Sequence, residues 1–382
     1  MRNRTVFGNL KYNKKLEIGD GCGIKLLANI GHMDMDSSFE DELKKAEIAV
    51  KYDVDILADN TITCKSFYYK KWIKHNLPVM LNTVPIYDCF DKMENGKFEY
   101  SLLDEAIDKH IDIGSDMLVF HPTLTKELAN EVFQSSRLIK VTSRGGSQMY
   151  RYLIKYYNRE NPYYEHWDTI CEKMAGTGVA IAIGLSLRSG SILDDMDNLF
   201  MKELDIAGKL IEKALSLNIP IVVEGIGHVK LPNIERLFEE VKNRCHHIPI
   251  KTLGPLLSDR MIGNEHINSL LGGYCAANAG AAILGVLFRS EHLGLPSVFE
   301  YEESLVNYSM LKYIINMSAQ DIEQERRISI ARSNRDWAGV LKNAFYSKEV
   351  VEQFHCRYGK TAPKTCTMCG ERCAMKIINL DT

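Results

Sequence analysis

Short apolar, β-branched runs alternate with amphipathic stretches through most of this chain, and this alternation limits its fold more than any other feature. Stretches such as 39–52 and 201–217 place apolar residues three to four positions apart, as in a helix that packs one face on a core. The strand-like runs are 24–28, 54–58, 79–82, 117–120, 138–142, 179–183, 220–223 and 249–252. Strand followed by helix, repeated in this way, is typical of an α/β fold of the (β/α)8 TIM barrel type, although a doubly wound sheet gives similar local signals.

The polar residues near the ends of these runs favour the barrel. Nearly every run is followed closely by a polar or charged side chain: Asn29, Asp59 with Asn60, Tyr87, His121, Ser143 with Arg144, Arg188, Glu224 with His228, and Lys251. In a barrel the carboxyl ends of the strands meet on one face, which carries the active site. We therefore expect these side chains to gather in one place.

We expect four segments along the chain. A short N-terminal segment (1–23) precedes the barrel (24–300), a charged helical region (301–347) follows, and a hinge and tail (348–382) complete the chain. The last residues are too few to bury a core of their own without a metal centre, which predicts a metal in the tail.

Composition argues against several classes of function. The net charge is −3 with both signs interspersed, so we expect no binding to nucleic acid or to an anionic membrane. No apolar run is long enough to span a bilayer, and the first residues lack the apolar core of a signal peptide, which predicts a cytoplasmic protein. Cysteines of such a protein do not form a disulfide framework. Six of them, scattered singly, should be small buried or half-buried hydrophobes: Cys22, Cys64, Cys89, Cys171, Cys245 and Cys275.

The tail is different, because it brings Cys366, Cys369 and Cys373 close together in sequence around Gly370. Three thiolates so spaced can hold an iron–sulfur cluster, with one iron left open for a small ligand. A structural zinc site, completed by His355 or Cys356, is the alternative. The spacing leaves both open.

Two further patterns suggest chemistry on the barrel. Glu224-Gly-Ile-Gly-His228 and Glu291-His292 would allow a metal site of two imidazoles, although each histidine alone could be satisfied locally. Ser143-Arg-Gly-Gly-Ser147 and Gly190-Ser191 combine glycine, hydroxyl and guanidinium groups suited to a phosphate, although tight βα turns would look the same.

Six ordered motifs together resemble the ThiC family, from about residue 24 to 378. They are Asn82-Thr-Val-Pro-Ile-Tyr87, Thr142-Ser-Arg-Gly-Gly-Ser147, Glu224-Gly-Ile-Gly-His228, Thr252-Leu-Gly-Pro-Leu256, Glu291-His-Leu-Gly-Leu-Pro296 and the cysteine tail. The resemblance implies a TIM barrel with a C-terminal helical region and a mobile tail that binds an iron–sulfur cluster, in a homodimer. The long N-terminal domain of the thiamine enzymes is essentially absent from this sequence.

The resemblance also implies an activity. A [4Fe–4S] cluster on Cys366, Cys369 and Cys373, with S-adenosylmethionine and an external electron donor, would start a radical carbon–carbon lyase reaction on 5-aminoimidazole ribotide, with Glu224 also counted as catalytic. The implied substrate contacts are Asn29, Tyr87, His121, Ser143, Arg144, Gly145, Arg188 and Glu224. His228 and His292 would bind an additional metal, zinc or another divalent ion.

Several positions depart from the family pattern. The last cysteine gap is one residue shorter, an acidic substrate contact is replaced by Leu185, and a tyrosine is replaced by Lys251. The expected product is 4-amino-5-hydroxymethyl-2-methylpyrimidine phosphate for thiamine, with 5-hydroxybenzimidazole for the cobalamin lower ligand, or the product of a different ribotide, as alternatives. Two alternatives of another class are a zinc-tailed barrel that binds a nucleotide without catalysis, and a hydrolase using Glu224, His228 and His292.

Overall fold

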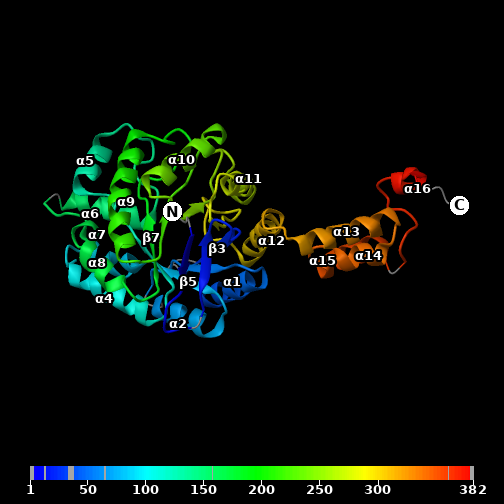
Figure 1. The fold of residues 1–382 in the computed structure, drawn as a ribbon, viewed down its shortest axis with the longest axis horizontal. Coiled ribbons are helices and arrows are strands. Elements are labelled where there is room, and N and C mark those ends of the chain that lie inside the picture. The colour runs from blue at the N-terminus through cyan, green and yellow to red at the C-terminus, as the bar shows by residue number, and fades with distance from the viewer. Residues whose placement is uncertain are drawn as a thin grey trace. The chain divides into compact units, whose positions relative to one another are not determined.

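The computed structural model describes residues 4–12, 14–32, 38–63, 66–156, 158–359 and 361–378. The chain forms two compact units, Met1–Ile315 and Asn316–Thr382, which are described separately (Figure 1). No helix in these ranges is long and apolar enough to cross a membrane.

The first unit is a closed barrel of parallel strands, which confirms the predicted (β/α)8 architecture. The strands are β3 (Lys25–Ile30), β4 (Ile56–Asp59), β5 (Met80–Thr83), β6 (Met117–Phe120), β7 (Ala180–Gly184), β8 (Ile221–Glu224), β9 (Ile250–Leu253) and β10 (Ile283–Gly285). They follow one another around the barrel in chain order, and β10 closes it by pairing with β3 and β9. Nearly all of their residues are buried, as expected for strands covered on both faces.

The prediction of a strand at 138–142 is wrong, and β10 takes the missing place. β6 pairs directly with β7, so no strand fits between them. The segment forms a loop, in which the backbone N–H groups of Leu138 and Ile139 donate to the Asp194 carboxylate over 3.0 and 2.9 Å. Its apolar side chains face outward, and Leu138 is 64% exposed. The loop therefore imitates a buried strand in composition, whereas β10 is too short to give a periodic signal of its own.

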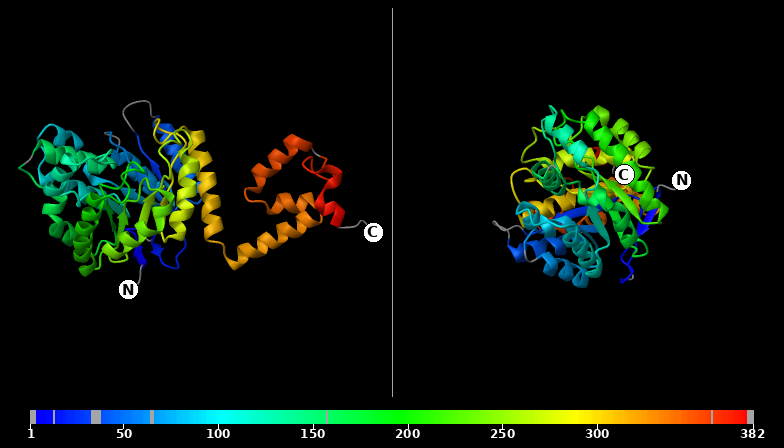
Figure 2. Two further views of the ribbon diagram at one scale, coloured as in Figure 1. Left: turned by 90° about the horizontal axis from the view of Figure 1, so that it is seen from above. Right: turned by 90° about the vertical axis from the view of Figure 1, so that its left-hand side faces the viewer.

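Helices surround the barrel (Figure 2). The longer ones are α1 (Phe39–Lys51), α2 (Ser66–Asn76), α4 (Tyr100–Asp112), α5 (Lys126–Gln134), α6 (Arg144–Lys155), α8 (Trp167–Met174), α9 (Asn198–Ser216), α10 (Ile234–Arg244), α11 (Glu265–Asn278) and α12 (Val298–Ile315). Shorter ones are η1 (Pro85–Cys89), α3 (Phe90–Glu94), α7 (Pro162–Glu165) and η2 (Leu231–Asn233). In α9 the Asp197 carboxylate caps the first turn, and the apolar face predicted from the sequence is buried.

The N-terminal segment packs beside the amino ends of β6 and β7. Strands β1 (Arg4–Phe7) and β2 (Leu16–Gly19) form an antiparallel hairpin. The backbone N–H of Asn9 donates to Asp116, directly before β6, over 3.0 Å, and Lys74 donates to the same carboxylate over 2.7 Å. The cavity described below lies at the opposite end of the barrel.

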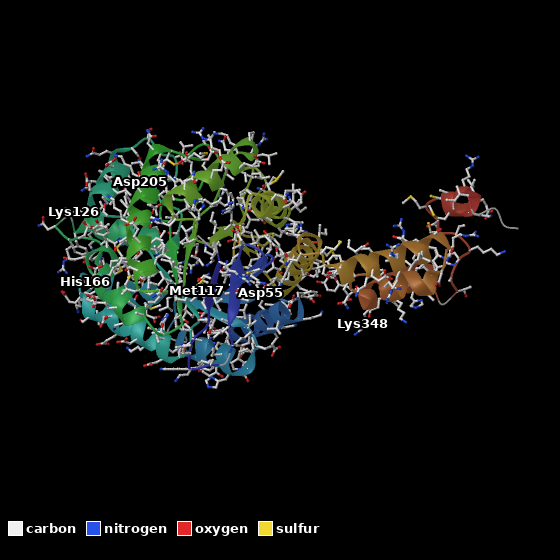
Figure 3. All side chains as sticks on the ribbon, in the orientation of Figure 1. Asp55, Met117, Lys126, His166, Asp205 and Lys348 are labelled. Atoms are coloured by element: carbon white, nitrogen blue, oxygen red, sulfur yellow. The ribbon has the colours of Figure 1, made fainter. Side chains whose placement is uncertain are left out.

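The helical region predicted for 301–347 divides between the two units. Helix α12 packs on α1 and α11 in the first unit. Its Lys312 Nζ donates to Oδ2 of Asp55, directly before β4, over 2.8 Å (Asp55 is labelled in Figure 3).

The second unit contains α13 (Ala319–Ser333), α14 (Trp337–Asn343), α15 (Ser347–Tyr358), η3 (Gly370–Arg372) and α16 (Ala374–Ile378). The Trp337 and Phe354 rings lie 5.2 Å apart, and the Trp337 indole N–H donates to the carbonyl of Pro363 over 2.7 Å. Part of the predicted hinge is thus helical in α15, whereas Lys360 lies outside the described residues.

The scattered cysteines behave as predicted where the structure describes them. Cys89, Cys171 and Cys245 are buried, and burial raises the pKa of each thiol to about 12. Cys22 and Cys275 are half-buried, and Cys64 lies outside the described residues. Thiols with so high a pKa are not nucleophiles at neutral pH.

Candidate active site

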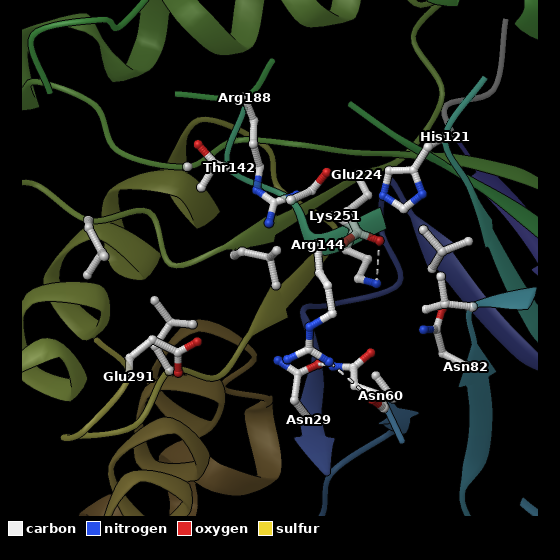
Figure 4. A pocket seen from close by; sticks show the side chains of 18 of the residues that line it. Asn29, Asn60, Asn82, His121, Thr142, Arg144, Arg188, Glu224, Lys251 and Glu291 are labelled. Carbon is white, nitrogen blue, oxygen red and sulfur yellow. Dashed lines mark hydrogen bonds and ion pairs between the residues drawn. The ribbon is translucent and has the colours of Figure 1, made fainter. Parts of the chain in front are cut away.

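A cavity of about 360 Å³ opens at the carboxyl ends of the barrel strands. The predicted side chains that line it are Asn29, Asn60, Tyr87, His121, Ser143, Arg144, Arg188, Glu224, His228, Lys251 and His292, whereas Asp59 does not line it. Figure 4 labels Asn29, Asn60, His121, Arg144, Arg188, Glu224 and Lys251 among them. Asn29 and Lys251 lie within their strands, and Ser143 begins a helix after a loop, so these three do not directly follow a strand as the sequence suggested. Gly145 lies beside the cavity and does not line it.

The floor of the cavity holds a buried ion pair. Lys251 Nζ lies 2.7 Å from Glu224 Oε2, and the side chains are 2% and 10% exposed. Burial alone would raise the pKa of Glu224, but the positive charges of Lys251 and Arg188 outweigh it, so the pKa is lowered. Burial lowers the pKa of Arg188 against the opposing effect of Glu224. The floor therefore presents a fixed carboxylate between two cations.

His121 is a neutral imidazole in this floor. Burial lowers its pKa to about 4, and the Glu224 charge offsets the effect in part. The ring packs so tightly on the chain that a Cβ at Gly145 would collide with its Cε1, and a Cβ at Gly184 would lie 2.9 Å from its Nε2. Gly145 therefore acts here by letting the imidazole approach the start of α6.

The two predicted phosphate motifs pack against each other, and Thr142, Ser143 and Arg144 of the first line the cavity. Ser143 caps α6, and its Oγ accepts from the N–H of Gly146 over 3.0 Å. A Cβ at Gly190 would collide with Thr142 Oγ1, so the two glycine-containing segments pack against each other. The amino end of a helix favours an anion, because its N–H groups and dipole point outward. Arg144 adds a positive charge at the same place.

Arg144 is held over the cavity by two contacts. Its guanidinium lies 5.5 Å from the centre of the Tyr87 ring, and its Nη1 donates to the carbonyl of Asn60 over 3.2 Å. The Asn60 side chain in turn donates to Asn29 Oδ1 over 3.1 Å. Side chains from β3, from the turn after β5 and from α6 thus form one connected group.

Three buried polar atoms facing this region lack a hydrogen-bond partner within the described residues: Asn82 Oδ1, His121 Nδ1 and Thr142 Oγ1. Buried polar groups are almost always paired, and an unpaired one costs about 1–3 kcal/mol. Their grouping around one cavity indicates a polar ligand that pairs with them.

His228 and His292 face each other with ring centres 5.5 Å apart. His228 Nδ1 lies 2.7 Å from Asp259 Oδ1, and Asp259 is itself fixed by Ser191 Oγ over 2.8 Å and the N–H of Ile192 over 3.0 Å. An ionised carboxylate accepts, so Nδ1 carries the proton and Nε2 has a free lone pair.

His292 has a similar neighbour. Its Nδ1 lies 3.3 Å from Oε1 of Glu265, which is 1% exposed. Two imidazoles, each backed by a carboxylate, suit a divalent metal whose other positions are filled by water or substrate. Within the described ranges no three His, Cys, Asp or Glu side chains are grouped to hold a metal, so the protein would supply two ligands.

The tail cysteines lie in the second unit on a compact turn. The N–H of Gly370 donates to the carbonyl of Cys366 over 3.0 Å, and the N–H of Cys373 donates to the carbonyl of Gly370 over 3.2 Å. Cys366 and Cys373 are half-buried, and Cys369 is exposed. Three accessible thiols on one turn are the right donor set for a cluster. Among the described residues these three thiols do not converge on a common point.

The alternative zinc ligands lie on α15, before this turn. His355 Nδ1 contacts the carbonyl of Gly359 over 2.8 Å, and Cys356 is exposed.

Sequence reasoning missed the carboxylates that contact the histidines in and beside the site. Asp259 belongs to a segment without strand or helix periodicity before α11, and Glu265 is the first residue of that helix. Asp88 pairs with the buried His110 over 2.9 Å beside Tyr87. A carboxylate in an irregular segment or at the first position of a helix gives no local signal of its function. Such a partner emerges only when the chain is folded.

A family model described as the radical SAM ThiC family matches residues 5–380. Among curated proteins named phosphomethylpyrimidine synthase, that of Pyrococcus abyssi is 32% identical and covers 98% of this chain and 89% of its own length. The enzyme of Carboxydothermus hydrogenoformans is 32% identical over 95% of this chain and 86% of its own length. That of Fusobacterium nucleatum is 31% identical over 97% of this chain and 87% of its own length.

Proposed function

Because this chain belongs to the radical SAM ThiC family, we propose that it is a radical S-adenosylmethionine lyase that converts 5-aminoimidazole ribotide into 4-amino-5-hydroxymethyl-2-methylpyrimidine phosphate. The observation that carries the proposal is the single cavity that joins an anion-binding helix start to a charged floor. A ribotide has a phosphate at one end and a heterocycle at the other, and this cavity offers groups for both. The relatives' name supports the pyrimidine product.

The barrel residues would bind and orient the ribotide. Ser143, Arg144 and the start of α6 would hold the phosphate, while Glu224, Arg188 and His121 would contact the heterocycle. The side chains of Leu253, Leu256 and Val119 would shield the bound ring from water. Positioning of this kind holds a reactive substrate in one geometry while bonds are broken.

Cys366, Cys369 and Cys373 would hold the cluster, because their donor set leaves one iron open for S-adenosylmethionine. When bound, this cluster and S-adenosylmethionine supply the radical that begins the reaction. An external donor would deliver the electron. The two imidazoles of His228 and His292 would hold zinc or another divalent ion that orients the substrate.

We also propose a homodimer. Ile267, Leu271 and Tyr274 lie on one side of α11 and are 48%, 54% and 49% exposed, which supports an apolar contact with a second copy. Light scattering after size exclusion would give the mass directly, and a monomer at micromolar concentration would count against it.

The decisive experiment is single-turnover chemistry under anaerobic conditions. Protein reconstituted with iron and sulfide is mixed with dithionite, S-adenosylmethionine and 5-aminoimidazole ribotide, and the products are identified by mass. We expect 5′-deoxyadenosine and the pyrimidine phosphate together, and neither when the ribotide is left out. Release of 5′-deoxyadenosine with another mass in place of the pyrimidine phosphate would refute the assigned product, and turnover without S-adenosylmethionine would point to a hydrolase.

A further inference from the structure

Lys251 is a charged side chain with unused donors inside the cavity. It lies in β9, is 2% exposed, and donates from Nζ to Glu224 Oε2 over 2.7 Å. An ammonium group has three N–H donors. Among the described residues Glu224 is the acceptor for one of them, and no other acceptor is in reach. Two donors of a buried cation therefore remain for a ligand.

The rest of the floor cannot satisfy these donors. Arg188 is a second cation, and it makes no hydrogen bond with a described residue. Leu185, directly after β7, is fully buried and brings no polar atom to the floor. Unsatisfied donors on a buried charge are costly, so a ligand that supplies an acceptor gains more here than one that supplies a donor.

We infer that Lys251 determines which heterocycle the site accepts, by donating a hydrogen bond to an acceptor atom on the ring of a phosphorylated ligand. The inference rests on the proposed function, because it takes the ligand to be a ribotide. The acceptor has two chemical sources: the unsubstituted ring nitrogen of 5-aminoimidazole ribotide itself, or a carboxylate attached to the ring. A ring that presents a donor or a positive charge to Lys251 is rejected.

The test compares ligands that differ at the ring and share the phosphate. The full-length protein is titrated by calorimetry with 5-aminoimidazole ribotide, its 4-carboxylate derivative and ribose 5-phosphate. Lys251→Met keeps the length of the side chain and removes its charge and donors. We expect it to weaken binding of the better ribotide about 10- to 100-fold and to leave ribose 5-phosphate within about twofold.

Lys74→Met is the matched control, because Lys74 is another buried lysine, 2.7 Å from the Asp116 carboxylate at the other end of the barrel. It should leave the affinity for every one of the three ligands unchanged. The ribotide that loses affinity in Lys251→Met identifies the acceptor. If the 4-carboxylate derivative binds the unaltered protein better, the acceptor is the carboxylate. If 5-aminoimidazole ribotide binds it better, the acceptor is the ring nitrogen.

A double variant separates recognition from simple charge neutralisation. The reference for it is the single variant Glu224→Gln, because Glu224 also lines the cavity. If Lys251 only neutralises its partner, adding Lys251→Met to Glu224→Gln costs no further affinity, and the inference is wrong. If Lys251 contacts the ring, adding Lys251→Met weakens ribotide binding further. Equal ribotide affinity in the unaltered protein and Lys251→Met also overturns the inference but leaves the proposed function intact. Failure of the unaltered protein to bind either ribotide instead refutes the proposed function.

Discussion

In the barrel unit, the side chains around the cavity come from strands and loops spread between Asn29 and His292, whereas the three thiols of the C-terminal unit come from one stretch, 366–373. The barrel groups are buried and held by partners distant in sequence, such as Lys251 with Glu224 and His228 with Asp259. The tail cysteines are half-buried or exposed, and the bonds around them join near neighbours.

This contrast teaches how two kinds of chemistry are encoded. A rigid pocket must fix several groups against one another before the ligand arrives, which requires tertiary contacts. A metal cluster gathers its own ligands, since its bonds to the thiolates supply the energy for ordering the chain. Among the described residues of the C-terminal unit one apolar side chain is buried, that of Ala331 at 7% exposure, as expected if a cluster adds stability there.

The largest expected effect tests the independence of the two regions. Cys369→Ala should abolish the absorbance of the reconstituted cluster and lower turnover at least about 1,000-fold, because two thiolates cannot hold the cluster in its active form. The melting temperature of the barrel should stay unchanged, since Cys369 is exposed in the other unit.

Cys356→Ala is the control for this variant. Cys356 is exposed on α15, outside the three-cysteine turn, and its removal should leave cluster and turnover as they are. Loss of the cluster in Cys356→Ala would mean that this thiol is a ligand.

The next variant breaks the packing of the pocket. A Cβ at Gly145 would collide with the His121 ring, so Gly145→Ala should displace this imidazole, lower kcat/KM about 100-fold and cost about 1–3 kcal/mol of unfolding free energy. Gly273 lies in α11, and a Cβ there would meet its nearest atom, Leu284 Cδ1, at 3.5 Å, so Gly273→Ala should be neutral or slightly stabilising. Equal kinetics in both variants would show that the close approach to His121 has no function.

A smaller effect is expected from the carboxylate behind His228. Asp259→Asn keeps the shape of the side chain but removes the charge that fixes the His228 ring, and metal affinity should fall about 10- to 100-fold. Competition with a chelator for bound Co²⁺ gives the affinity, and the cobalt absorption reports the geometry. Asp205→Asn, an exposed partner of Arg244, should leave both unchanged. If the two variants bind cobalt alike, Asp259 does not position the ligand.

The last expected effect is on acid stability. Burial holds the pKa of His121 at about 4, so between pH 6.5 and 4 the unfolded chain takes up a proton that the folded barrel refuses. The stability that results is complete above pH 6.5 and is lost as the pH falls to 4, by about 3 kcal/mol. In urea unfolding over the same pH range, the free energy of unfolding of His121→Asn should fall by about 3 kcal/mol less than that of the unaltered protein. Parallel pH profiles for the two proteins would show that His121 is protonated freely in the folded state.

Much of the barrel site could be predicted from sequence, because parallel strands deliver their carboxyl ends to one face whatever loops join them. This geometry is why Tyr87, His121, Arg188 and Glu224 could be grouped before their contacts were known. Boundaries were less certain where composition misled: 138–142 has the residues of a strand but is a loop, and β10 is a strand of three residues.

The sequence by itself determined the barrel class, the family and the candidate thiols of the tail, because periodicity, motif order and spacing are local properties of a chain. The tertiary structure decided the partners: Lys251 against Glu224, Asp259 behind His228, and Gly145 beneath His121. These contacts join residues from different strands and loops, and their energies depend on burial that exists only in the folded barrel. Spacing in the sequence therefore identified the candidate side chains. The folded barrel determined the charge, the tautomer and the neighbours of each one.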